Sequence, residues 1–238
     1  MPLNISGTTI SGSTISTLPT TNIVRRGLVL HLDAGSTNSY SGSGNIWFDL
    51  SGNVYNGTLN NGPTYSSNKN GYLSFNGSNQ NVTLPPTSIP SGNQISFCVW
   101  NYGITSTSSS VIECRDSTGE RTINVHLPWA GNTIYFDCGQ NRLYQYVSDS
   151  EYLGWNYWCF TKNVSTGTMV IHRNGSIWAS STGNVGTINT TTVGRLCSYA
   201  VDTTYHNGYL GNVQIYNRQL STAEVLQNYN IQKSRFGL

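Results

Sequence analysis

The stretch that decides the fold is GNVQIYNRQLSTAE, residues 211–224. Its first half belongs to an apolar run, residues 209–216, that has the composition of a strand. Its second half contains a capping box, in which the Ser221 hydroxyl caps the Glu224 amide and the Glu224 side chain reaches back. Leucine and valine flank the box at the two positions of a hydrophobic staple. The stretch therefore predicts a strand followed by a short helix over about residues 222–230 and a tail.

The rest of the chain contains many short runs with the composition of strands. In the strongest, alternation places one set on each face: Ile95, Phe97 and Val99, and Cys98, Trp100 and Tyr102. Apolar residues on both faces predict a central strand that is buried on both sides or lines a groove. Asn174-Gly175 is a hairpin turn dipeptide within 168–179. Further strands are predicted at 28–32, 72–75, 82–84, 110–114, 122–127, 133–137, 157–161 and 192–197. Short strands at close spacing favour one antiparallel sandwich over βαβ units.

Charge is scarce in this chain of 238 residues. Charged residues make up 9% of it and the formal net charge is +2, whereas an ordinary globular protein is about a quarter charged. A strongly basic nucleic-acid-binding protein is excluded, because such a protein needs a positive field over its footprint. No apolar run approaches the length that spans a bilayer. We therefore expect neither nucleic acid nor membrane insertion among its interactions.

The cysteines and the first residues bear on the compartment. Cys98, Cys114, Cys138, Cys159 and Cys197 form no CxxC pair, so they give no zinc or redox motif. The first residues have no basic region followed by an apolar core, so they do not predict a secretory signal. Free, buried thiols made in a reducing cytoplasm are the simplest interpretation. Spacing alone does not decide whether any of the cysteines pair.

The N-terminal segment differs from the rest of the chain. Residues 1–26 space single aliphatic residues among Ser, Thr and Gly, too sparsely to bury a face. We interpret them as an extended arm that orders against a partner, with a frayed tail as the alternative. The candidate anchor residues are Ile5, Ile10, Ile15 and Leu18. The remainder, 27–238, is predicted to be a single domain.

These elements together resemble the laminin-G-like, concanavalin A-like jelly-roll family. Residues 27–34 resemble its opening strand, and residues 211–224 carry the most specific match, since strand, Tyr-Asn-Arg and capped helix follow in one stretch. The resemblance implies an all-β fold of two antiparallel sheets packed face to face. Other matching stretches are 47–59, 73–77, 95–100, 155–158 and the 174–175 turn. A narrower resemblance, in Asp33-Ala-Gly, Ser51-Gly-Asn and the last four residues, is to laminin-G-like proteins of tailed bacteriophage particles.

The same fold also includes glycoside hydrolases, which need two carboxylates facing each other across the scissile bond. In the densest acidic stretch, Glu113 and Asp116 are separated by an odd number of positions, so a continuous strand places them on opposite faces. Residues 117–119 have turn composition, and no Gly-x-Ser-x-Gly motif occurs. The four scattered histidines are interpreted as structural or surface residues. We therefore predict no enzymatic activity and no catalytic residues.

No motif requires a cofactor. The family resemblance implies one candidate, a structural calcium ion, because related jelly rolls often hold one. Asp49, Asn53 and Asn56 are oxygen donors on one loop, and carboxylate and amide oxygens are ligands that calcium prefers. The alternative is that Asp49 and Asn53 cap the amides of turns, as such side chains often do. Both interpretations remain open from the sequence.

Glycan binding requires planar aromatic groups together with amide, carboxylate or guanidinium groups. One candidate set is Trp129, Asn132, Arg142, Tyr144 and Tyr146, and a second is Tyr205 with His206. The alternative is that Tyr144 and Tyr146 pack across the sandwich, half-buried with a wet hydroxyl. Strand alternation assigns Trp100, Trp155 and Trp158 to the core or to a groove wall.

The favoured function is a non-enzymatic structural or adhesion module of a tailed-phage particle: capsid decoration, head fibre or tail appendage. In this hypothesis the arm binds other virion proteins, the jelly roll contacts cell-surface glycans, and the chain is a homo-oligomer in the virion after assembly in the host cytoplasm. The alternative is a free glycan-binding lectin. A glycoside hydrolase is the third interpretation, and it predicts activity that depends on Glu113.

Overall fold

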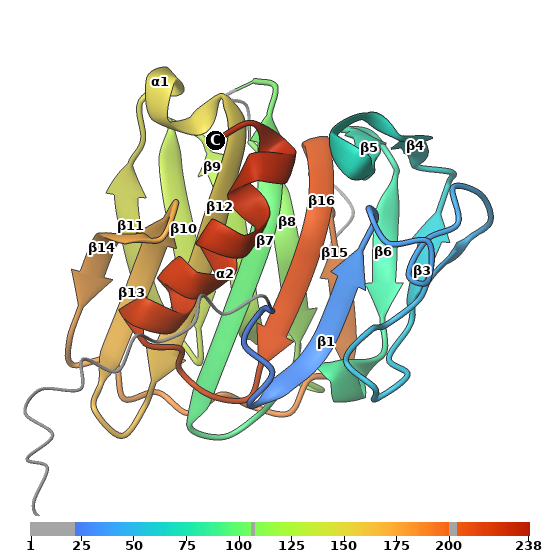
Figure 1. The fold of residues 1–238 in the computed structure, drawn as a ribbon. Coiled ribbons are helices and arrows are strands. Elements are labelled where there is room, and N and C mark those ends of the chain that lie inside the picture. The colour runs from blue at the N-terminus through green and yellow to red at the C-terminus, as the bar shows by residue number, and fades with distance from the viewer. Residues whose placement is uncertain (1–21, 106–107, 200–203) are drawn as a thin grey trace, which may run out of the picture.

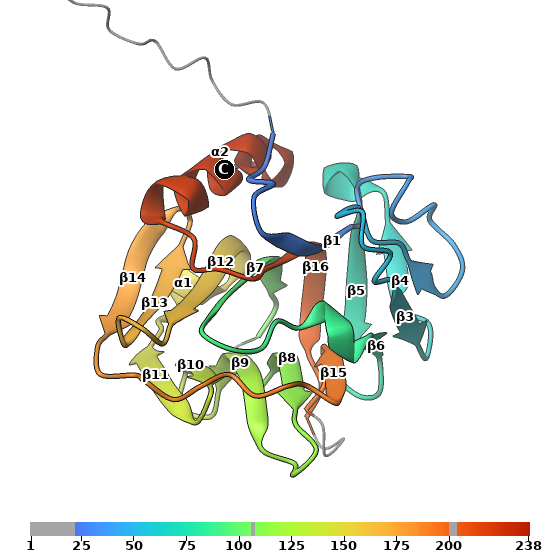
Figure 2. The same ribbon diagram turned by 90° about the horizontal axis from the view of Figure 1, so that it is seen from below.

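Two antiparallel sheets packed face to face form the molecule (Figure 1, Figure 2). The structure is a computed structural model that describes residues 22–105, 108–199 and 204–238. One sheet, sheet A, contains in spatial order β14 (Ser176–Ser181), β13 (Thr168–Arg173), β12 (Gly154–Asn163), β7 (Gln94–Gly103), β16 (Asn207–Tyr216), β5 (Tyr72–Asn76) and β4 (Thr64–Ser66), with β1 (Leu28–Asp33) also paired to β16. The predicted two-sheet jelly-roll sandwich is confirmed.

The second sheet, sheet B, lies against sheet A and has eight strands in the part of the chain that the structure describes. Their order is β11 (Asn141–Tyr146), β10 (Thr133–Cys138), β9 (Arg121–Trp129), β8 (Ser110–Arg115), β15 (Val193–Leu196), β6 (Asn81–Leu84), β3 (Gly57–Asn60) and β2 (Ile46–Trp47). Short helices connect some strands: α1 (Asp149–Tyr152) and the 3-10 turns η1 (Asn68–Asn70) and η2 (Pro86–Ser88). Within the described residues no helix is long and apolar enough to cross a membrane.

The interior is divided into two apolar layers by sheet A. Ile95, Phe97 and Val99 of β7 face the main core between the sheets, whereas Cys98 and Trp100 belong to a second cluster on the opposite side of β7. The predicted central strand buried on both faces is therefore confirmed. The two sets of residues separate because a strand has a two-residue period, in which successive side chains point to opposite faces.

The C-terminal helix α2 (Thr222–Phe236) covers the outer face of sheet A, as Figures 1 and 2 show. Its start is the predicted capping box, with the Ser221 hydroxyl accepting from the Glu224 amide at 3.3 Å. The helix continues past the predicted end near residue 230, because Phe236 is buried and stacks on Trp100 with ring centroids 4.2 Å apart. It ends at Gly237, which has a left-handed φ of 82°.

The domain begins earlier than the sequence predicts. Ile23 and Val24 are buried, and the Val24 amide donates to Asn228 Oδ1 of α2 at 2.8 Å. Tyr216 Oη donates to the Val24 carbonyl at 3.1 Å. The predicted boundary between arm and domain, at Gly27, is therefore too late. The anchor candidates Ile5, Ile10, Ile15 and Leu18 lie outside the described residues.

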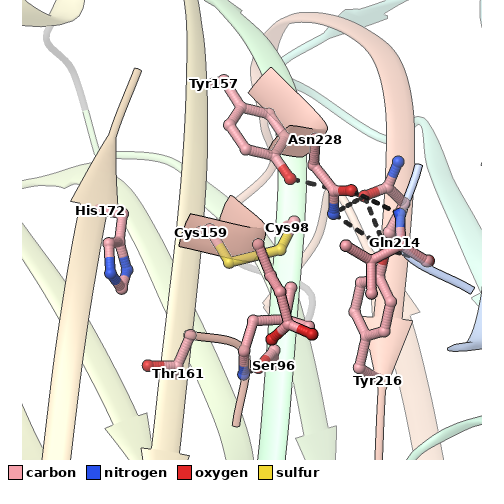
Figure 3. The surroundings of a disulfide bond; sticks show 12 residues. Ser96, Cys98, Tyr157, Cys159, Thr161, His172, Gln214, Tyr216 and Asn228 are labelled. Atoms are coloured by element: carbon pink, nitrogen blue, oxygen red, sulfur yellow. Dashed lines mark hydrogen bonds between the residues drawn. A yellow bond between two sulfur atoms is a disulfide. The ribbon is translucent and has the colours of Figure 1, made fainter. Parts of the chain in front are cut away.

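One pair of cysteines corrects the expectation of free thiols. Cys98 of β7 and Cys159 of β12 are directly opposite in the antiparallel register, with Cα atoms 4.0 Å apart, and form a disulfide beneath α2 (Figure 3). Such register pairs bring Cα atoms close enough to bridge, which spacing along the chain does not reveal. Cys114, Cys138 and Cys197 are free and buried, as predicted for them.

Candidate functional site

The outer face of sheet B carries a row of polar side chains in register across the strands. Inward positions of β10 hold Ile134, Phe136 and Cys138, so the alternate position, Asp137, faces outward. Neighbouring strands present one partner each in the same register, and the row reads Arg142, Asp137, Asn124, Glu113, Arg195, Thr83 and Thr58. We call this set the polar row. It places charges of opposite sign next to each other across the sheet.

Asp137 is the centre of one half of the polar row. Its buried carboxylate accepts from Arg142 Nε at 2.5 Å and Nη2 at 2.8 Å, and from Arg121 Nη1 at 2.8 Å. Hydrogen bonds to Asp137 raise the pKa of Arg142 above its usual value. Each guanidinium has five N–H donors, and these contacts fix both groups in one orientation while leaving further donors for a ligand.

Glu113 is the centre of the other half. It is fully buried, and its Oε1 lies 2.6 Å from Arg115 Nη2. The ring of Tyr199 lies beside Arg115 and Arg121, whose guanidinium carbons are 5.4 and 5.5 Å from the ring centroid. Arg121 Nη2 also donates to Tyr199 Oη at 2.6 Å. Cation–π contacts and hydrogen bonds thus hold Tyr199 against the sheet.

Aromatic rings form a second row beside the polar row. Tyr144, Tyr135 and His126 are opposite one another on β11, β10 and β9. The Tyr135 and Tyr144 rings stack with centroids 5.7 Å apart, and the His126 ring lies 4.2 Å from Trp129. Burial lowers the pKa of His126 to about 4, so this imidazole is neutral at pH 7.

Two adjoining cavities open on this face. The larger has a volume of about 690 Å³ and is lined by Arg115, Gly119, Glu120, Arg121, Asp137, Gln140, Asn141, Arg142 and Tyr199. The smaller, about 150 Å³, is lined by Arg121, His126, Trp129, Tyr135 and Arg142. Because Arg121 and Arg142 line both, we treat them as one site, the arginine cavity. It offers guanidinium and amide donors beside aromatic faces.

The first predicted glycan set is only partly assembled here. Trp129 and Arg142 line the arginine cavity, as the sequence favours. Tyr144 and Tyr146 are 62% and 63% exposed on the outer face, so the alternative that they pack across the sandwich is wrong. Asn132 lies in the turn before β10 and donates to Asp149 Oδ1 at 3.2 Å. Among the described residues that line the two cavities, Asn132 does not occur.

The second predicted set is divided. Tyr205 lines a shallow polar hollow of about 410 Å³ together with Asn60, Asn61, Asn81, Thr83 and Arg195. His206 is wrong as a sugar contact, because it is fully buried and its Nδ1 lies 2.5 Å from Ser109 Oγ. The two residues directly precede β16, and consecutive residues of an extended chain point in opposite directions, so only Tyr205 reaches the surface.

Sequence reasoning missed four residues that build the site: Arg121, Tyr135, Asp137 and Tyr199. Tyr135 and Asp137 lie at alternate, outward positions of the predicted strand 133–137, and that pattern could have identified them. Arg121 directly precedes the predicted strand 122–127, and an irregularity in the register of β8 and β9 places it opposite Arg115. Tyr199 follows β15 and gives no such signal, because its position depends on how this loop folds back over Arg121.

The calcium candidates share one loop, where hydrogen bonds occupy the side-chain oxygen atoms of Asp49 and Asn56. Asp49 Oδ1 accepts from the amides of His31 and Ser51 at 2.9 and 2.8 Å. Asp49 Oδ2 accepts from the Tyr55 amide at 3.1 Å, and Asn56 Oδ1 accepts from the Asp49 amide at 2.9 Å. Asn53 Nδ2 donates to the Val29 carbonyl at 2.9 Å. This donor set fits turn capping and does not fit a calcium ion.

The acidic stretch does not form a hydrolase pair. Glu113 is tied to Arg115 on the outer face, whereas Asp116 lies in the turn that joins β8 and β9, where the Gly119 amide donates to its carbonyl. Hydrogen bonds from Thr118 and Asn189 lower the pKa of Asp116 to about 2. Within the described residues, no group of three His, Cys, Asp or Glu side chains could hold a metal ion.

A known protein family matches more than half of this chain. The Laminin_G_3 family model, described as the Concanavalin A-like lectin/glucanases superfamily, matches residues 76–226. Among curated proteins, none matches this sequence.

Solved structures of the same fold include binding domains. The binding domain of botulinum neurotoxin serotype G matches with a TM-score of 0.66 and 19% identity, over 87% of this chain and 51% of that one. The binding domain of botulinum neurotoxin DC in complex with rat synaptotagmin II has a TM-score of 0.67 and 13% identity, over 88% and 52%. Our chain therefore spans about half of these toxin chains.

A third structure matches over nearly its whole length. It is domain 4 of AbnA, a GH43 extracellular arabinanase from Geobacillus stearothermophilus, in complex with arabinotriose. The TM-score is 0.61 and the identity 16%, over 85% of this chain and 98% of that one. At these identities the likeness establishes a shared fold and no more.

Proposed function

We propose a function from one premise: the chain belongs to the Concanavalin A-like lectin/glucanases superfamily. The function is that of a lectin-like binding module, which holds a carbohydrate in the arginine cavity on the outer face of sheet B. The structural neighbours named above, toxin binding domains and an arabinotriose-bound domain, support binding as the activity to test.

The observation that carries the proposal is the pairing of aromatic rings with fixed hydrogen-bonding groups around one cavity. The rings of Tyr135 and Trp129 line the cavity, where aromatic side chains can contact the apolar faces of a sugar, while Arg121 and Arg142 can donate to its hydroxyl oxygens. Asp137 holds both guanidinium groups in place before any ligand arrives. Pre-arranged side chains lose little conformational entropy on binding, which favours affinity.

The same contacts favour binding over hydrolysis. A glycosidase needs two carboxylates that face each other across the scissile bond. Asp137 instead accepts hydrogen bonds from Arg121 and Arg142, and Glu113 is ion-paired with Arg115. Both carboxylates are thus engaged by arginines of the same sheet, which supports a module without catalytic activity.

A glycan array followed by titration calorimetry tests the proposal. We expect selective binding by the wild type and a loss of about tenfold or more for Trp129→Ala, because stacking on an aromatic ring contributes strongly to such contacts. Phe48→Ala is the matched control, since Phe48 is 50% exposed outside the site. If no array glycan binds, or if both variants bind like the wild type, the proposed site is wrong.

For the biological setting we propose a tailed-phage particle, with virion localisation after assembly in the host cytoplasm. The support is the sequence resemblance and the Ser/Thr/Gly-rich residues 1–21, which precede the docked segment at Ile23 and Val24. In this proposal residues 1–21 bind other virion proteins, the protein is a homo-oligomer, and many copies raise the avidity of a weak glycan site. A free lectin is the alternative, and it predicts strong binding by the monomer.

Deleting residues 1–21 tests that setting. The truncated domain should stay folded, since the deleted residues precede the docked segment at Val24, and it should no longer sediment with purified particles. Continued incorporation into particles, or absence of the full-length protein from them, contradicts the virion proposal but leaves glycan binding untouched.

A further inference from the structure

We propose that the sugar bound in the arginine cavity is acidic, with its anionic group placed between Arg115 and Arg121. This rests on the proposed function and names the class of ligand for the same site. The anionic group is a carboxylate or a sulfate. The carboxylate group is planar and the sulfate group is tetrahedral, and both present several oxygen atoms that a guanidinium group can bind.

The first support is the arrangement of charge. Arg115 of β8 and Arg121 of β9 are directly opposite in the strand register. Like charges in this position repel each other, and the sheet loses stability unless a counter-charge lies between them. Both guanidinium groups lie beside the same Tyr199 ring, and both arginines line the cavity.

The second support is how the neighbouring carboxylates are used. Asp137 is shared by Arg121 and Arg142, and Glu113 lies between Arg115 and its register partner Arg195. Each buried carboxylate thus has two arginines as neighbours, which leaves positive charge in excess on both halves of the polar row. The other acidic residue of the lining, Glu120, is exposed, where water and salt screen its charge.

The third support is an unused donor. Arg115 Nη1 donates to the Gly119 carbonyl and Nη2 contacts Glu113, but its buried Nε–H has no acceptor within the described residues. A buried donor without an acceptor costs free energy, and an oxygen of an anionic ligand restores the missing hydrogen bond. Three observations therefore support an anionic ligand: the repulsion between Arg115 and Arg121, the excess of positive charge in the polar row, and the Arg115 Nε–H donor that has no acceptor among the described residues.

The test compares three probes by titration calorimetry on the full chain: trigalacturonate, the neutral galactose trisaccharide and a sulfated heparin-derived hexasaccharide. We expect one of the two acidic probes to bind at least about tenfold more tightly than the neutral one, because charge-assisted hydrogen bonds form only with the former. The carboxylated and sulfated probes separate the two sources of charge. Raising the salt from about 50 to 300 mM should weaken acidic binding severalfold and leave neutral binding unchanged.

Variants locate the effect. Arg121→Gln should remove most of the preference for the acidic probe, and Arg121→Lys should retain part of it, since the charge remains but the planar fork is lost. Arg26→Gln changes the net charge equally, from an exposed position before β1, and should bind like the wild type. Thermal melting checks that each variant is folded, and the salt dependence of the wild type needs no variant.

Each outcome separates the two proposals. Equal or tighter binding of the neutral trisaccharide overturns the inference and leaves the proposed function intact. Acidic binding that Arg121→Gln and Arg26→Gln reduce equally also overturns it, because the effect then reflects net charge alone. If no array glycan and none of the three probes binds, the proposed function fails and the inference fails with it.

Discussion

The outer faces of the two antiparallel sheets differ in what lies on them. On sheet A, α2 covers the face, and a second apolar cluster including Trp100, Tyr157 and the Cys98–Cys159 disulfide lies beneath it. On sheet B the corresponding face is open and carries the polar row and the arginine cavity. Figure 2 shows the helix on one side of the sandwich only.

The difference shows where stability and binding are separated in this fold. Beneath α2 even the polar groups face inward, as Asn228 Nδ2 donates to Tyr216 Oη at 2.9 Å and to Gln214 Oε1 at 3.2 Å (Figure 3). On sheet B, the buried carboxylate of Asp137 holds Arg121 and Arg142, whose side chains are partly exposed. The outer side chains of sheet A therefore contact a helix, whereas those of sheet B can contact a ligand.

The largest expected effect comes from the covered face. Trp100→Ala removes a fully buried ring that stacks on Phe236 and donates from Nε1 to Gln232 Oε1 at 2.6 Å. We expect the free energy of unfolding to fall by about 3–5 kcal/mol, measured by chemical denaturation. Tyr144→Ala, on the open face, is the control and should cost less than about 1 kcal/mol. Similar losses for both variants contradict the distinction between the faces.

Replacing a buried histidine on either face should have an intermediate effect on the free energy of unfolding. Burial lowers the pKa of His126 on sheet B to about 4 and also lowers the pKa of His172 on sheet A. The unfolded state, with a pKa near 6.5, binds protons more readily, so the stabilisation is complete above about pH 6.5 and is lost as the pH falls toward 4.

The measurement is the free energy of unfolding between pH 7 and pH 4. His126→Gln should reduce its pH dependence by about 1–3 kcal/mol, because the neutral amide does not titrate. His172→Gln should act in the same direction, since its ring is also buried, at 2% exposed. An unchanged pH profile for His126→Gln, or a normal pKa of this ring by NMR titration, shows that the open face is more hydrated than the structure indicates.

The smallest expected effect is at the start of α2. Glu224 accepts from Arg218 Nη1 and Nη2, both at 2.7 Å, and closes the capping box with the Ser221 amide at 3.0 Å. Glu224→Gln should cost about 1 kcal/mol, measured by thermal melting, because the charge-assisted fork is lost while an acceptor remains. Glycan binding on sheet B should not change. A loss of binding in this variant indicates that the two faces are coupled.

The pH profile of that contribution has a defined sign. Hydrogen bonds from Arg218 lower the pKa of Glu224 to about 2. The stabilisation from Glu224 is therefore present above its unfolded pKa of about 4.3 and is lost as the pH falls toward 2. The difference between wild type and Glu224→Gln should shrink across this interval, and a difference that stays constant excludes the ionised carboxylate as its source.

Local patterns predicted much of the fold. The capping box at Ser221, the Asn174-Gly175 turn and the alternation along β7 all involve residues a few positions apart, and the structure confirms each. A second box, Ser148 with Glu151, marks the start of α1, and the same local pattern could have predicted it.

The site itself was predicted less well, because its members meet only across strands. Arg142 and Trp129 have the residue types that sugars require, but Asp137, Arg121 and Tyr199 acquire their roles from register and from a folded-back loop. The opposite error concerns His206, which has a residue type that could bind a sugar but whose side chain is buried. Residue type therefore indicates what a side chain can bind, and the register decides whether it reaches the ligand.

By itself the sequence determined the sandwich, its central strand and the start of α2, because periodicity and capping are properties of adjacent residues. The tertiary structure alone decided that Phe236 prolongs the helix, that Cys98 meets Cys159, and that two arginines oppose each other beside Tyr199. These are contacts between segments distant along the chain. Their energies depend on which strands become neighbours, and no local pattern records that choice.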